Sequence, residues 1–194
     1  MSAIPKPKLL TEEEYLRIER AAEYKSEYYR GEMFAMAGAR LKHTRIKRNF
    51  ERRLGERLDG SPCEPFSSDL RVKVSATGMY TYPDLGVFCG EPQLLDKHFD
   101  TLLNPKLLVE ILSDSTAKYD QGRKFEQYQT IPSLMEYVLV SQDAPQCVSY
   151  FRQEDGHWRY TRCEGLEATL VLESLGIRVP LAEIYAGVEF DPAE

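Results

Sequence analysis

The sequence has no run of apolar residues approaching the roughly 20 that a membrane-spanning helix needs. Residues 1–10 also lack the apolar core of a signal peptide. With 42% hydrophobic and 29% charged residues, the composition does not match that of collagen, a coiled coil or a low-complexity chain. These absences predict a folded cytoplasmic protein with no membrane partner.

Cysteine is scarce as well. The four cysteines lack the paired spacing of a zinc site and the density of a disulfide framework. We therefore expect all four to be reduced, and most to be buried as small hydrophobic side chains. They are Cys63, Cys89, Cys147 and Cys163.

An overall positive charge is missing too. The net charge of −6 disfavours a protein that binds nucleic acid over its whole surface. The sign changes along the chain, however, because residues 1–60 carry 14 basic and 10 acidic side chains. Most of this excess lies in residues 40–53, which form either a solvated helix face or a surface that binds phosphates. The residues that would contact a DNA backbone are Arg40, Lys42, Arg45, Lys47 and Arg48.

A chain of 194 residues is long enough for one domain with a single core. We expect the core at about residues 40–140 and a C-terminal β elaboration at about 145–194. Thr11 and Glu14 form a capping-box pattern that predicts a helix over about 12–23. Arg30 and Gly31 predict a tight turn between strands 24–29 and 32–36. Apolar residues four apart then predict a helix over about 41–59.

Alternating and continuous apolar runs predict the remaining elements. The run at 106–112 is apolar almost throughout, which is typical of a central strand covered on both faces. The polar segment 90–105 is long enough to be a mobile surface loop. We expect all the strands to join one sheet. The predicted strands are 63–74, 80–89, 106–112, 136–140, 147–152, 157–162 and 168–179, and the predicted helices are 120–130 and 180–186.

Glu110 interrupts the most apolar of these strands. A buried carboxylate costs several kcal/mol unless it meets a metal, a cation, hydrogen bonds or a proton. The alternative is that Glu110 lies at a strand end and pairs with an arginine.

Asp84 follows Pro83 and precedes another apolar run. Because proline is confined to strand starts or irregular positions, we expect a strand to begin at Asp84. If the two strands pair with Asp84 near Glu110, the carboxylate oxygens would suit a hard divalent cation that keeps several waters. An aspartate after proline otherwise caps a turn.

Lys124 follows on the next predicted helix, with Asp120 and Tyr128 one turn away on the same face. Its ammonium could orient a metal-bound water or stabilise negative charge on a phosphate. The alternative is an ordinary exposed pair with Asp120.

The order of these residues resembles the restriction-endonuclease-like superfamily, whose signature is Pro-Asp, a spacer, then Asp or Glu, any residue and Lys (PD-(D/E)XK). It resembles more closely a bacterial branch of that superfamily, long described as a domain of unknown function. The fold that this implies is α/β (α+β), with a central mixed sheet flanked by helices, an N-terminal helix and β-hairpin, and a C-terminal β-hairpin extension. The matching residues are Thr11–Tyr15, Glu27, Tyr28, Gly31, Glu32, His43, Ser68, Asp69, Tyr82–Asp84, Val109–Ser113, Asp120, Gly122, Lys124, Tyr128, Ile131–Ser133, Glu136 and Tyr137.

The resemblance implies that Asp84, Glu110 and Lys124 are catalytic. It implies a Mg²⁺ site, which Mn²⁺ could also occupy, formed by the two carboxylates and the backbone carbonyl of Ile111. The signature lysine would fall at position 112, which is Leu112 here, so its role would pass to Lys124.

Five further residues would lie around the same cleft by resemblance: Glu27, His43, Asp69, Ser113 and Tyr128. Residue by residue, other interpretations stay open. His43 and Tyr128 could be core residues, Asp69 could cap a turn, and Glu27 could pair with a lysine.

The sequence therefore predicts a divalent-metal-dependent endonuclease that acts on DNA, with no recognition module that would indicate a sequence preference. The alternative is an inactive nuclease fold that binds nucleic acid or protein. A homodimer would suit cleavage of both duplex strands. Its candidate surface is the aromatic hairpin with Tyr150, Phe151, Trp158 and Tyr160, although these rings could equally cover the sheet edge.

Overall fold

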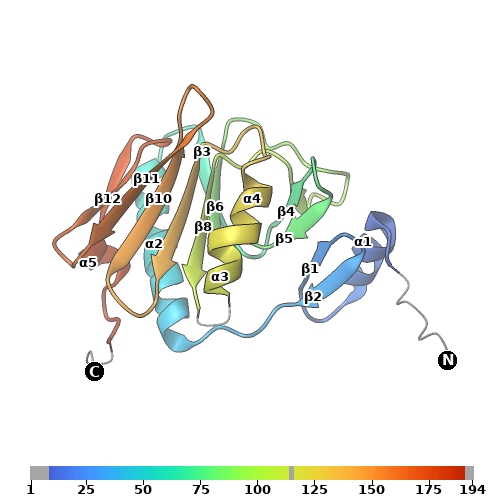
Figure 1. The fold of residues 1–194 in the computed structure, drawn as a ribbon, viewed down its shortest axis with the longest axis horizontal. Coiled ribbons are helices and arrows are strands. Elements are labelled where there is room, and N and C mark those ends of the chain that lie inside the picture. The colour runs from blue at the N-terminus through green and yellow to red at the C-terminus, as the bar shows by residue number, and fades with distance from the viewer. Residues whose placement is uncertain (1–8, 114–115, 191–194) are drawn as a thin grey trace.

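The computed structural model describes residues 9–113 and 116–190, and its largest element is a mixed six-stranded sheet (Figure 1). Its strands are β3 (Cys63–Ser67), β6 (Leu85–Cys89), β8 (Leu107–Leu112), β9 (Glu136–Ser141), β10 (Gln146–Arg152) and β11 (Trp158–Glu164). The order in space is β11-β10-β9-β8-β6-β3. Strands β8 and β9 are parallel and the other neighbouring pairs are antiparallel. This confirms the expected mixed sheet, with β8 buried along nearly its whole length.

Helix α2 (Leu41–Leu58) covers one face of this sheet, behind it in Figure 1. Its predicted apolar stripe is buried against Leu85, Val109 and neighbouring residues of β6, β8 and β9. Each such side chain contributes about 1.5–3 kcal/mol through burial. The stripe consists of Ile46, Phe50, Leu54 and Leu58.

A broken helix covers the opposite face, in front of the sheet in Figure 1. It consists of α3 (Ala117–Tyr119), the π-helical turn η1 (Asp120–Lys124) and α4 (Phe125–Tyr128). The sequence predicted this helix over about 120–130, without the π-helical turn. Because such turns are frequent at functional sites, the one that ends at Lys124 makes that residue a candidate.

The sequence suggested that all the strands join one sheet, and this expectation is wrong. Two of the predicted strands each divide between the six-stranded sheet and a second sheet. A turn at residues 68–70 separates β3 from β4 (Arg71–Val74), and residues 82–84 separate β5 (Met79–Thr81) from β6. Pro83 has no N–H to donate to a neighbouring strand, so the ladder is interrupted there. In both cases the chain passes from one sheet to the other.

The second sheet has five strands in the order β2-β1-β5-β4-β7. Strands β1 (Ser26–Tyr29) and β2 (Glu32–Ala35) form the predicted hairpin, with positive φ at Arg30 and Gly31. Positive φ at both central residues is the geometry that a tight two-residue hairpin turn requires. Helix α1 (Glu12–Ala21) packs on this sheet through Tyr15 and begins with the predicted capping box.

Segment 90–105 is not a loop along its whole length, although its polarity and length suggested one. It contains β7 (Thr101–Leu102), which pairs with β4. Asp100 binds Arg20 of α1 and the buried Arg71 of β4, at 2.7 and 2.9 Å. These ion pairs hold the segment against the second sheet.

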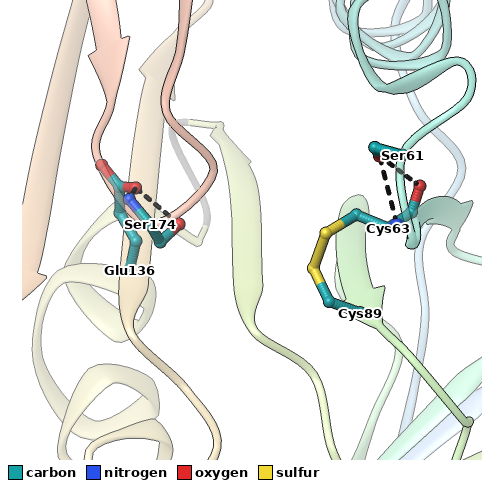
Figure 2. Close-up of a disulfide and its surroundings, with 5 residues drawn as sticks. All are labelled: Ser61, Cys63, Cys89, Glu136 and Ser174. Atoms are coloured by element: carbon teal, nitrogen blue, oxygen red, sulfur yellow. Dashed lines mark hydrogen bonds between the residues drawn. A yellow bond between two sulfur atoms is a disulfide. The ribbon is translucent and has the colours of Figure 1, made fainter.

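The expectation of four reduced cysteines is wrong for two of them. Cys63 and Cys89 are directly opposite in the β3–β6 register and form a disulfide (Figure 2). Directly paired residues of antiparallel strands have Cβ atoms about 4.5–5.5 Å apart, a proximity that a separation of 26 positions does not reveal. Cys147 and Cys163 are free, and Cys147 is buried as expected.

The C-terminal region adds a small sheet of its own. Strands β12 (Thr169–Leu172) and β13 (Ile177–Pro180) pair with each other, so the predicted strand 168–179 is a hairpin. Helix α5 (Leu181–Ile184) follows, as expected, and packs with both strands in the α2 core. Glu136 of β9 accepts hydrogen bonds from the backbone and hydroxyl of Ser174, which fixes the β12–β13 turn (Figure 2).

The aromatic hairpin β10–β11 mainly covers the sheet. Tyr150 and Trp158 pack against Phe125 of α4, with ring centroids 4.4 and 5.3 Å apart. Tyr160 is the exception, because 55% of it remains exposed. In the described part of the chain no helix is long and apolar enough to span a membrane.

Replacing Gly86 of β6 with alanine is expected to destabilise the protein by about 1–3 kcal/mol, the usual cost of overpacking. A Cβ at Gly86 would lie 2.3 Å from Cζ of Phe66, its cross-strand partner. Urea unfolding measures the change. Gly55→Ala in α2 is the matched control, because its Cβ meets nothing within 4 Å and should stabilise the helix by about 0.5–1 kcal/mol. Equal stability of the two variants would contradict the packing described.

Candidate active site

Asp84 lies directly before β6, opposite Glu110 of the neighbouring strand β8. Leu85 pairs with Val109 in the antiparallel β6–β8 register, so the preceding residue, Asp84, faces Glu110. The Asp84 carboxylate accepts a hydrogen bond from the backbone N–H of Ile111 at 2.8 Å. The structure therefore brings the two carboxylates together as the sequence suggested.

Glu110 is buried in the middle of the layer between β8 and the broken helix. Its Oε1 accepts hydrogen bonds from the Tyr128 hydroxyl at 2.9 Å and is 2.8 Å from Lys124 Nζ. Burial raises the pKa of Glu110 well above its usual range, and the nearby ammonium opposes that rise. The charge is compensated by a lysine, so the alternative of a strand-end pair with an arginine is wrong.

Lys124 is the centre of the site. Its side chain is only 6% exposed, which excludes an ordinary solvated pair with Asp120. The ammonium lies 3.1 Å from Glu27 and 3.7 Å from Asp120, in addition to Glu110. Burial lowers the pKa of Lys124, but these carboxylates outweigh it and raise the pKa well above its usual value. The lysine is therefore positively charged and held in place from three sides.

His43 and Glu27 extend the site from two other elements. His43, in the first turn of α2, places Nε2 2.8 Å from Asp84 Oδ1. Glu27 of β1 accepts a hydrogen bond from the Thr81 hydroxyl as well as pairing with Lys124. Glu27 therefore does pair with a lysine, as the alternative interpretation held. That lysine is Lys124, so the pair is part of the candidate site.

Negative charge exceeds positive charge in this cluster. The carboxylates of Glu27, Glu110 and Asp120 lie around the ammonium of Lys124, and Asp84 adds a fourth carboxylate opposite Glu110. Burial raises the pKa of Asp120, as it does that of Glu110, because ionised carboxylates are costly in a crowded interior. A bound cation would relieve this excess.

The donor set fits a hard divalent cation. In the described residues no three or more Asp, Glu, His or Cys side chains are arranged to hold a metal by themselves. Mg²⁺ does not require such a cage, because it is usually bound by one or two carboxylates, with water and substrate phosphate completing the shell. Oε2 of Glu110 accepts no hydrogen bond from any residue described, and it lies on the strand next to Asp84.

Two residues of the predicted cleft lie further out. The Asp69 carboxylate binds Lys25, and 85% of its side chain is exposed. Ser113 directly follows β8, and its hydroxyl contacts that of Thr116 at 3.0 Å. The structure thus groups Tyr128, His43 and Glu27 with the carboxylates, whereas Asp69 and Ser113 bind other partners.

The basic residues of α2 divide into two groups. Arg53 and Arg57, in its C-terminal half, bind Glu183 of α5 and so stabilise the fold. Lys47 lies one turn after His43, and its ammonium donates to the hydroxyl of Ser68. The guanidinium groups of Arg45 and Arg48 donate to Gly187 O and Asn49 Oδ1. Arg40 and Lys42 lie at the helix N-terminus, beside His43.

Thr81 and Tyr119 belong to the site, although the sequence did not single them out. Thr81 binds Glu27, and the ring of Tyr119 lies 5.9 Å from Lys124 Nζ. Tyr119 lies five residues before Lys124, a spacing that shares a face only in a π-helical turn. No pattern in the sequence indicated that turn.

Most of the chain matches one protein family. Residues 12–182 match the family Uma2, described as "Putative restriction endonuclease". Two uncharacterized proteins from Synechocystis sp. are each 36% identical to the chain. Protein sll1609 aligns over 88% of this chain and 96% of its own, and slr1290 over 96% of both.

A solved structure shares the fold. The crystal structure of a putative nuclease belonging to DUF820, from Anabaena variabilis, matches with a TM-score of 0.75. The alignment covers 91% of this chain and 98% of that one, at 17% sequence identity. The arrangement of sheets and helices described above is thus that of a known nuclease-like fold.

Proposed function

Because the chain belongs to the Uma2 family of restriction-endonuclease-like proteins, we propose that it is a divalent-metal-dependent endonuclease that hydrolyses phosphodiester bonds in DNA. One observation carries this proposal. Asp84 directly precedes β6 and lies opposite Glu110 of β8 when the strand register is continued, and the buried ammonium of Lys124 lies 2.8 Å from Glu110. Carboxylates can hold a divalent cation, and a fixed ammonium can stabilise the negative charge that develops on a phosphate.

Asp84 and Glu110 would hold the metal, Mg²⁺ or in its place Mn²⁺, together with the backbone carbonyl of Ile111. When bound, such an ion activates water and neutralises charge on the phosphate. His43 has a positioning role, because its contact with Asp84 and the Ile111 N–H together fix the orientation of that carboxylate. Tyr128 orients Glu110 in the same way.

Lys124 replaces the signature lysine absent at position 112. Residue 112 is on β8, two positions after Glu110, whereas Lys124 reaches Glu110 from the helix above the sheet. Its contacts with Glu27 and Asp120 keep the ammonium charged and in one place. A fixed cation there would stabilise the negative charge that develops on a phosphate without first having to reorganise.

Arg40, Lys42, Arg45, Lys47 and Arg48 would bind the DNA backbone. They belong to the half of α2 that begins beside the site, and Lys47 lies one turn from His43 on the same helix face. Contacts of this kind position the strand and carry no base sequence.

Incubating the purified protein with supercoiled plasmid tests the proposal. We expect nicked or linear DNA with Mg²⁺ or Mn²⁺ and none with EDTA. The metal should also raise the melting temperature, because a ligand that binds only the folded state stabilises it, by about 2.7 kcal/mol at 100 times its Kd. Intact plasmid and an unchanged melting temperature with either metal would instead favour an inactive module that binds nucleic acid or protein.

A further inference from the structure

A cavity of about 190 Å³ lies on the same face of the sheet as Glu110. It is smaller than the roughly 300–1,000 Å³ of sites for drug-sized ligands, and so suits a single small group. Its lining residues come from η1 and from strands β8, β9, β10 and β11. They are Leu112, Gln121, Leu139, Ser141, Gln146, Val148, Tyr150 and Tyr160.

The strand register places this cavity beside the proposed catalytic group. Leu139, in its floor, is the direct cross-strand partner of Glu110. Neighbouring strands are about 4.8 Å apart, so the cavity begins one strand away from that carboxylate. Leu112 lies two residues after Glu110 and therefore on the same face. Gln121 follows Asp120 in the turn that carries Lys124.

The chemistry of the lining is that of a site for a flat aromatic ring with polar edges. Leu139 and Val148 make the floor apolar, and the amides of Gln121 and Gln146 provide donors and acceptors at the sides. Tyr160 contacts Tyr150 edge-on, with centroids 5.6 Å apart, while 55% of Tyr160 is exposed to solvent. An aromatic side chain with this exposure provides a surface for stacking.

An arginine holds one edge of the cavity in place. Arg162 is the cross-strand partner of Val148, and its guanidinium donates to Gln146 Oε1 at 2.9 Å. The same guanidinium pairs with Glu164 at 2.8 Å, so the two side chains together carry no net charge. The arginine holds one of the two cavity amides in place, so the polar edge is preorganised.

We propose that this cavity binds one unpaired base of the DNA strand, next to the phosphate that is cleaved. The inference rests on the proposed function, because it takes the scissile phosphate to lie at Asp84 and Glu110. Tyr160 stacks on the base, and the amides of Gln121 and Gln146 contact its edge. A base inside a duplex is stacked on both sides and cannot enter without being flipped out. The preferred substrate is therefore single-stranded or locally unpaired DNA.

The test measures binding without cleavage. The full-length protein in EDTA is titrated into a single-stranded oligonucleotide that carries 2-aminopurine, a base whose fluorescence falls on stacking, and into its duplex. We expect tighter binding and stronger quenching with the single strand. Tyr160→Ala should weaken single-strand binding by about 5- to 150-fold, the range measured for loss of one stacked base. Tyr160→Phe keeps the ring and should bind as wild type.

Tyr24→Ala is the matched control, because Tyr24 is a tyrosine of similar exposure, at 67%, in the segment between α1 and β1. Urea midpoints verify that each variant is folded. The proposal is overturned if Tyr160→Ala retains wild-type affinity and quenching, or if the wild type does not bind the single strand. The binding test contains no metal, so its result does not depend on cleavage. A protein that stacks the base through Tyr160 but does not cut plasmid with metal would refute the nuclease function and support the base site.

Discussion

Replacing Asp84 with asparagine or Glu110 with glutamine is expected to lower plasmid cleavage by at least about 10²- to 10³-fold, the loss typical of removing one group that stabilises transition-state charge. Each change removes a carboxylate charge from the β6–β8 pair and keeps the side-chain volume. The Mn²⁺-dependent rise in melting temperature should disappear in parallel, because the same oxygens would hold the ion. Initial rates of nicking and thermal denaturation measure the two effects.

Asp69→Asn is the matched control for this pair of variants. Asp69 is an acidic residue of the same predicted cleft, but its carboxylate is largely exposed and binds Lys25. We expect cleavage close to that of the wild type. Undiminished cleavage by both Asp84→Asn and Glu110→Gln would refute the assignment of the site, whatever the behaviour of the control.

Asp100→Ala is expected to destabilise the fold by about 3 kcal/mol, the lower end of the cost of breaking a buried ion pair. Arg71 is 2% exposed, and its guanidinium also donates to Thr101 and Tyr82. Loss of Asp100 would leave that charge without its carboxylate partner. The lower end applies because Asp100 itself is 32% exposed and therefore partly solvated. Urea unfolding at pH 7 measures the change.

The same ion pairs predict a pH dependence. Hydrogen bonds from Arg20 hold the pKa of Asp100 well below its usual range, and the charge of Arg71 acts in the same direction. A lowered pKa in the folded state contributes stability above the unfolded-state pKa of about 3.9, and this contribution is lost as the pH falls further. The free energy of unfolding should therefore fall less steeply below pH 4 in Asp100→Ala than in the wild type.

Asp96→Ala controls for the loss of an acidic residue in the same segment. Asp96 binds Arg20 at the surface, where such a pair contributes little to stability. A destabilisation by Asp100→Ala no larger than that of Asp96→Ala would show that Arg71 does not depend on Asp100.

Local patterns in the sequence predicted several of the helices and strands. The four-residue apolar spacing from Ile46 to Leu58 predicted α2, and its observed bounds differ by one residue at the C-terminus. The capping box predicted the start of α1, and the apolar run around Glu110 predicted a central strand. Such patterns are reliable because burial repeats with the period of the backbone itself.

The conflict between Glu110 and its apolar surroundings also located the candidate site. A buried charge must be compensated, so the sequence alone required a partner for this residue. It offered Asp84 as the neighbouring carboxylate, and the β6–β8 register agrees. Which cation compensates Glu110, however, depends on how far the helix that follows β8 lies from the sheet. The π-helical turn brings Lys124 there, and no periodic pattern marked that turn.

What the sequence determined by itself was thus the identity of the main elements, the uneven distribution of charge and the need for a compensated carboxylate in β8. Tertiary structure alone decided that β3 and β4 enter different sheets, that Asp100 reaches Arg71, and that Cys63 pairs with Cys89. It also decided that Glu27 of β1 reaches Lys124. The reason is physical: periodicity reports which face of one element is buried, whereas these contacts join residues far apart in the chain and depend on register and packing between elements.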